Sequence, residues 1–191
     1  MVVATPSKSV TCRDDLQDPG TGNPFATYAG QAYKDGMTVE LRPITAENFD
    51  AVLKLEVLPE QSDFVAPNVR GLAETYIYPE AEPRAVYAGA DLVGFVLFHP
   101  IDRDRPAEGH CIVRLMIARE FQGRGLGREA LEAAVAWIAR ERGVDRVRLS
   151  VVPSNEKARA LYRSAGFVET GELDDGEIVM VRSVRDTAFS R

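Results

Sequence analysis

The sequence is poor in the residues that build disulfide frameworks, metal sites and membrane spans. Its 191 residues include two cysteines, two histidines and one tryptophan. Cys12 and Cys111 lie far apart, so we expect neither a disulfide framework nor a CxxC metal site, and we interpret both as reduced thiols. No run of about 18 apolar residues is present, and residues 1–10 lack the features of a signal peptide. We therefore expect no metal, no membrane partner and a cytoplasmic location.

The charge balance argues against a nucleic-acid-binding protein. The formal net charge is −6, whereas phosphate contacts require clustered lysine and arginine side chains. The charges are also unevenly placed: residues 37–83 hold nine carboxylates and three cations, and residues 114–128 hold four arginines and one glutamate. The first segment suits a cationic ligand and the second an anionic one, although solvated surface charge explains many such residues.

The length and composition predict one soluble domain. A chain of 191 residues with 45% apolar content is long enough for one substantial core and too short for two ordinary domains. Residues 1–36 are rich in Thr, Ser, Gly, Pro and Asp and show no sustained periodicity, which is typical of a flexible extension. We therefore expect an extension over 1–36, a compact domain over 37–185 and a tail over 186–191.

Hydrophobic periodicity and turn residues predict an interleaved order of strands and helices. The expected strands are 38–44, 84–88, 92–98, 111–118, 147–152, 167–173 and 177–181, and the expected helices are 46–55, 69–76, 125–142 and 155–165. Thr45 is the expected N-cap of the first helix, and Gly143 the expected C-cap of the third. This order predicts an α/β (α+β) domain, a mixed sheet with helices on its faces.

A glycine-rich loop joins the strand ending at Ala118 to the long helix. The segment Gln122-Gly123-Arg124-Gly125-Leu126-Gly127 places unpaired backbone N–H groups at a helix N-terminus, where the helix dipole favours an anion. A Walker loop would need Gly-Lys-Ser/Thr, and a dinucleotide-binding turn would need a glycine where Arg128 stands. Neither pattern fits, so the loop predicts a phosphate site of another kind or a tight strand-to-helix turn.

These residues resemble the acetyl-CoA motif of the GNAT superfamily of N-acetyltransferases. The likeness rests on Gln122-x-x-Gly125-x-Gly127 after the strand Arg114-Leu115-Met116-Ile117. It continues in a second segment that contains Ser154-Asn155, Ala158, Leu161-Tyr162 and Gly166-Phe167. The resemblance implies a GNAT-type fold with a mostly antiparallel sheet, acetyl-CoA as co-substrate, and a dimer as a common assembly.

The resemblance also implies roles for the matched residues. The backbone of Leu115, Met116 and Ile117 would bind the pantetheine arm, and Gly123 to Arg128 would hold the pyrophosphate. Asn155 and Tyr162 lie seven residues apart on one helix face, so both would face the cofactor. Tyr162 would protonate the departing thiolate, although a half-buried packing tyrosine is the alternative that its spacing alone favours.

The general base is left open by the sequence. Some members of this superfamily carry a glutamate in the strand where this chain has Val113. His110, Glu108, Glu56 or a water chain are the candidates. A covalent route through Cys111 is disfavoured because its apolar strand supplies no evident base.

Weaker similarities point toward bacterial spermine/spermidine N-acetyltransferases of the diamine type. They rest on Asp91–Phe95, the spacing of Leu55–Pro67, and the ending that contains Gly171–Asp174, Gly176-Glu177 and Val179–Val181. A polyamine acceptor would suit the acidic segment, where Glu56, Glu60 and Asp63 are candidate partners of its ammonium groups. A peptide N-terminus, an amino acid or an aminoglycoside is an alternative acceptor, and a non-catalytic acyl-CoA sensor is an alternative of another class.

Overall fold

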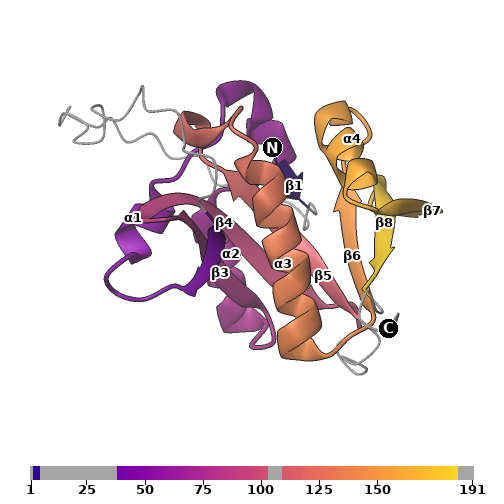
Figure 1. The fold of residues 1–191 in the computed structure, drawn as a ribbon, viewed down its shortest axis with the longest axis horizontal. Helices are drawn as coiled ribbons and strands as arrows, with labels where there is room; N and C mark the ends of the chain where they lie inside the picture. The colour runs from indigo at the N-terminus through magenta and orange to yellow at the C-terminus, as the bar shows by residue number, and fades with distance from the viewer. Residues whose placement is uncertain (1, 5–37, 103–108, 185–191) are drawn as a thin grey trace.

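The computed structural model describes residues 2–4, 38–102 and 109–184 (Figure 1). In chain order, with η marking short 3₁₀ helices, its elements are β1 (Val2–Ala4), β2 (Val39–Pro43), α1 (Phe49–Leu53), η1 (Pro59–Phe64), α2 (Asn68–Ile77), β3 (Glu82–Ala88), β4 (Asp91–Pro100), β5 (His110–Ile117), η3 (Arg119–Phe121), α3 (Leu126–Arg142), β6 (Arg146–Val151), α4 (Glu156–Ser164), β7 (Val168–Asp174) and β8 (Glu177–Ser183). Within these ranges no helix is both long and apolar enough to cross a membrane.

One sheet organises the molecule. Its strands run in the order β2-β3-β4-β5-β6-β8-β7, with β1 paired to β5. Every pairing is antiparallel except that between β5 and β6. The predicted mixed, mostly antiparallel sheet flanked by helices is therefore confirmed.

Helices cover both faces of the sheet (Figure 1). Leu131, Ala134 and Ile138 of α3 pack with alternate residues of the central strands to form the larger apolar cluster. Val52 of α1 and Leu72 of α2 belong to the smaller cluster on the other face. The period of 3.6 in residues 125–142 is thus used for sheet packing, as the apolar stripe predicts.

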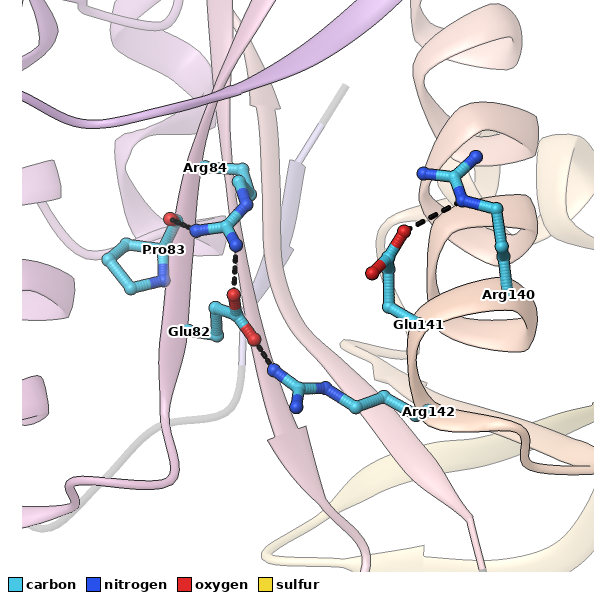
Figure 2. A network of polar contacts seen from close by, with 6 residues as sticks. All are labelled: Glu82, Pro83, Arg84, Arg140, Glu141 and Arg142. Carbon is cyan, nitrogen blue, oxygen red and sulfur yellow. Dashed lines mark hydrogen bonds and ion pairs between the residues drawn. The ribbon is translucent and has the colours of Figure 1, made fainter.

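The far end of α3 is tied to the sheet through Trp137 and an ionic network. The Trp137 ring stacks on Phe98 with 4.8 Å between ring centroids. Figure 2 shows the Glu82 carboxylate between the guanidinium groups of Arg84 and Arg142, with which it forms ion pairs. Both arginines also lie over the Trp137 ring. These contacts hold the C-terminal half of α3 against the sheet. Because the helix is continuous, they also help to fix the position of its N-terminus.

The central strands β5 and β6 separate soon after they begin. They pair in parallel only at His110 with Val147 and at Cys111 with Arg148. Farther along β5, its partner is β1, which is antiparallel to it at residues 114–116 and also lies against β6. A short strand from the beginning of the chain therefore fills the gap between two central strands.

Two local expectations differ from the structure. The first helix begins at Phe49, and Thr45 does not cap it: the Thr45 amide donates to Asn48 Oδ1 at 2.8 Å, which closes a turn ahead of α1. Within the extension over 1–36, Val2–Ala4 form β1. The rest of that extension and the tail over 186–191 lie outside the described residues, as do residues 37, 103–108 and 185 of the domain expected over 37–185.

Candidate active site

The glycine-rich loop has the backbone geometry of an anion cradle. Gly123 and Gly125 adopt φ values of 77° and 80°, in the left-handed region that favours glycine. Gly125 is the N-cap of α3, and no side chain caps the helix there. A Cβ atom at either glycine would meet nothing within 4 Å. The first amides of a 17-residue helix therefore face an open approach, which suits a phosphate group.

Gln122 holds this loop against the acidic segment. Its side-chain amide donates to the Ile117 carbonyl at 2.8 Å and exchanges two hydrogen bonds with the Gln61 amide at 2.8 and 3.0 Å. The Leu58 amide in turn donates to Gln61 Oε1. The Gln122 side chain thus holds the loop in position through its hydrogen bonds to Gln61 and Ile117.

Two arginines expected at the pyrophosphate have other contacts as well. Arg128 donates to the hydroxyl and carbonyl oxygens of Ser164 at 2.9 and 3.1 Å, which joins α3 to the end of α4. Arg124 lies over the Phe121 ring, 5.7 Å from its centroid. Leu126 is buried in the larger core, where its side chain anchors the first turn of α3.

A cleft of about 800 Å³ opens beside the loop. Of the predicted site residues, those that line it are Ile117, Gln122, Gly123, Gly127, Asn155 and Glu60. Asn155 is the N-cap of α4, with its Oδ1 accepting from the Ala158 amide at 3.2 Å. The loop and the start of α4 therefore meet at one cleft.

Lys157 and Arg119 also line this cleft, and the sequence analysis did not single them out. Lys157 follows the Asn155 cap by two residues. The sequence could therefore have predicted a cation in the first turn of this helix. The position of Arg119 depends on η3, which the sequence did not predict. Lys157 adds positive charge to this cleft, whereas the Arg119 guanidinium is paired with Glu56 and Glu120.

The strand expected to bind the pantetheine arm is paired with β1. The register places Val2 opposite Met116, Val3 opposite Leu115 and Ala4 opposite Arg114. A ligand that hydrogen-bonds to this edge of β5 therefore competes with β1 for the same backbone groups.

Tyr162 lies in the core and lines neither cavity described here. Its side chain is fully buried and packs edge-on against Phe167. Its hydroxyl has no hydrogen-bond partner among the described residues. Burial raises the pKa of Tyr162, and the nearby charge of Glu177 raises it further, so the phenol keeps its proton at neutral pH.

A second cavity, of about 280 Å³, lies near the point where β5 and β6 diverge. Its walls come from α2, the end of β4, the start of β5, β6 and β7: Glu74, Tyr78, His99, Pro100, Ile101, Cys111, Ile112, Val113, Arg148, Leu149, Ser150 and Asp174. Most of these residues could not be grouped from the sequence, because they come from five separate elements.

The three predicted acidic residues do not gather in one cavity. Glu60 lines the larger cleft, and Glu56 forms an ion pair with Arg119 at 3.1 Å. Asp63 is exposed on η1 and lines neither cavity.

The other candidate bases and nucleophiles have different surroundings. Burial lowers the pKa of His110, and the charge of His99 lowers it further, so the imidazole is neutral at physiological pH. Burial raises the pKa of the Cys111 thiol to about 11, which keeps it protonated and unreactive. Glu108 lies outside the described residues. Among the residues that the structure describes, no group of three or more His, Cys, Asp or Glu side chains could hold a metal ion.

Comparisons with known proteins agree on one family. A sequence model described as the acetyltransferase (GNAT) family matches residues 49–167. The spermine/spermidine N(1)-acetyltransferase of Bacillus subtilis strain 168 is 32% identical over 152 residues, which cover 78% of this chain and 100% of that protein.

Solved structures show the same fold. A spermidine N-acetyltransferase from Vibrio cholerae in complex with CoA and spermine aligns with a TM-score of 0.62 and 22% identity, over 76% of this chain and 95% of that one. An aminoglycoside acetyltransferase with coenzyme A and kanamycin aligns with a TM-score of 0.64 and 20% identity, over 77% and 95%.

Proposed function

This chain belongs to the acetyltransferase (GNAT) family and transfers an acetyl group from acetyl-CoA to an amine, and we propose that its acceptor is a polyamine such as spermidine or spermine. The observation that carries this proposal is the 32% identity with a spermine/spermidine acetyltransferase over the whole length of that protein. The acidic segment 37–83 supports it, because a polyamine carries several positive charges.

We propose that the cofactor binds in the larger cleft. The pyrophosphate would lie at Gly123–Arg128, at the N-terminus of α3, and Lys157 lines the same cleft. The pantetheine arm runs along the backbone of Leu115, Met116 and Ile117 after β1 has left that edge. The thioester then lies between the diverging strands, close to the smaller cavity.

The acceptor amine approaches through the smaller cavity. Glu74 and Asp174 are two carboxylates in its wall, each paired with an arginine (Arg114 and Arg148), and Tyr78 adds an aromatic surface. We propose that Glu60, which lines the larger cleft, pairs with a distal ammonium group. The neutral amine attacks the thioester carbonyl, and Tyr162 protonates the departing thiolate.

An assay of CoA release tests the acceptor. We expect turnover with spermidine and spermine, and little with lysine-ended peptides, free amino acids or an aminoglycoside. Turnover only with a peptide or an aminoglycoside would remove the polyamine proposal. Binding of acetyl-CoA without release with any amine would favour the acyl-CoA sensor.

Replacing one carboxylate tests how the polyamine is held. Glu60→Gln should raise the KM for spermidine several-fold and leave the KM for acetyl-CoA nearly unchanged. Glu47→Gln is the matched control, because Glu47 is an exposed carboxylate of the same acidic segment and lines neither cavity. Equal behaviour of the two variants would exclude Glu60 from the acceptor site.

We also propose, from the sequence alone, that the protein is a homodimer in the cytoplasm. Light scattering of the purified protein tests the dimer.

A further inference from the structure

One carboxyl group of the sheet is buried with a single hydrogen-bond partner among the residues that the structure describes. Glu177 begins β8 and is only 2% exposed. Ser150 of β6 donates a hydrogen bond to Glu177 Oε2 at 2.6 Å. The other carboxyl oxygen, Oε1, has no partner among the described residues, and the same is true of the Tyr162 hydroxyl. Two polar atoms, one on β8 and one on α4, are thus buried without a partner among the described residues, and each such atom usually has a functional cause.

Strand alternation connects Glu177 to the acceptor cavity. Along β6, Val147, Leu149 and Val151 join the larger apolar core. Because successive side chains of a strand point to opposite faces, Arg148 and Ser150 point to the other face. Both line the smaller cavity, so the Ser150 hydroxyl stands between that cavity and Glu177.

The surroundings of Glu177 suit a proton acceptor. Burial raises the pKa of Glu177 to about 7; the Ser150 hydrogen bond opposes the rise, and the charges of Asp174 and Asp175 add to it. Asp174 itself is paired with Arg148 at 2.7 Å. From α4, Tyr162 belongs to the larger apolar core and stays neutral, so it adds no charge at Glu177. A carboxyl group that titrates near neutral pH can both take and release a proton there.

We propose that Glu177 is the general base of the transfer, reached through the hydroxyl of Ser150. This inference rests on the proposed function, since it assigns the proton acceptor for the amine of that reaction. It also supplies the base that the sequence leaves open where Val113 replaces the strand glutamate of other family members.

The proton transfers of this mechanism balance without a further reactant. An ammonium proton moves to Ser150 Oγ as the Ser150 hydroxyl proton moves to Glu177 Oε2, which leaves a neutral amine and a carboxylic acid. The amine nitrogen bonds to the acetyl carbon, the carbon–sulfur bond breaks, and the nitrogen gives up its second proton. The sulfur gains one proton from Tyr162, which regains one from the nitrogen, and Glu177 releases its proton to solvent.

The test is the pH dependence of kcat/KM for spermidine between pH 5.5 and 9.5. The wild type should show a rising limb with an apparent pKa of about 7, because the base must be deprotonated to act. Glu177→Gln keeps the size of the side chain and its contact with Ser150, yet it should lose about 100-fold or more in rate, together with this limb. Its dissociation constant for acetyl-CoA should be unchanged.

Substitutions of two residues near Glu177 test the same rising limb of the pH profile without altering the Glu177 carboxyl group. Ser150→Ala removes the hydrogen bond that lowers the Glu177 pKa, so the limb should move to higher pH and the plateau should fall. Asp175→Asn is the matched control, because it removes a charge that raises the Glu177 pKa. Its limb should move to lower pH with an unchanged plateau.

The outcomes separate this proposal from the proposed function. A wild type that releases no CoA with any amine overturns both. A wild type that turns over, with Glu177→Gln retaining its rate and its limb, overturns the role of Glu177 alone. If Glu177→Gln does not fold, the other two variants decide. A rising limb with the wild-type apparent pKa in both Ser150→Ala and Asp175→Asn would also overturn the role of Glu177.

Discussion

Replacing Tyr162 by phenylalanine should change stability and activity in opposite directions. The buried hydroxyl has no partner among the described residues, and an unsatisfied buried polar group costs about 1–3 kcal/mol. Phenylalanine fills the same space and keeps the contact with the Phe167 ring. We therefore expect the free energy of unfolding to rise by about 1–2 kcal/mol, or roughly 2–8 °C in Tm for a chain of this size.

The same variant should lose turnover because it lacks the proton for the thiolate. General acids contribute about 100-fold to 10⁴-fold, so kcat should fall by about 100-fold or more while acetyl-CoA binding changes little. Thermal unfolding and CoA release, measured on one preparation, give both numbers. Tyr76→Phe is the control, since the Tyr76 side chain is 88% exposed and its hydroxyl is already in water. If the Tyr162→Phe variant is less stable and has normal turnover, Tyr162 does not act as the acid and serves only in packing.

Three further results are expected. Gly125→Val places a β-branched residue at a φ of 80° and a side chain in the phosphate approach, so calorimetry should detect no acetyl-CoA binding; a variant that binds tightly would exclude the cradle. Deleting residues 2–37 removes β1 from the edge of β5 and should lower the KM for acetyl-CoA, whereas an unchanged KM would show that β1 does not compete. Glu177 holds its proton in the folded state up to a pKa of about 7, against 4.5 ordinarily, so the folded protein should lose stability as pH rises from 4.5 to 7. Denaturant titrations should show a weaker loss in Glu177→Gln, and parallel curves would contradict the raised pKa.

Elements with a strong local pattern were predictable. The helix expected over 125–142 is observed as Leu126–Arg142, because two glycines with positive φ, Gly125 and Gly143, bound one apolar stripe. The turn at Asp175-Gly176 is also as predicted, since both residues adopt positive φ. In each case the information lies within a few neighbouring residues.

Features that depend on distant contacts were not predictable. Glu177 follows two aspartates and a glycine, so in the sequence it resembles a solvated hairpin charge; only the pairing of β8 with β6 buries it beside Ser150. The role of Gln122 in holding η1 was hidden for the same reason, since Gln61 is remote in sequence. The Thr45 cap was misplaced because the Thr45 hydroxyl accepts from the Glu47 amide within a separate turn, which ends before α1 begins at Phe49.

The outermost strand of the sheet bears on how copies of the protein meet. All seven residues of β7 are exposed, and its outer edge offers free backbone groups to any other strand. Gly171, with a φ of 85°, lies where the register with β8 shifts, so the strand is irregular. It also carries the charged side chains of Glu169, Glu172 and Asp174, of which Glu169 and Asp174 are ion-paired within the chain, and charged side chains on an edge strand oppose pairing with a second copy. Edge-to-edge aggregation is thereby disfavoured, and two copies that associate are expected to do so through another surface.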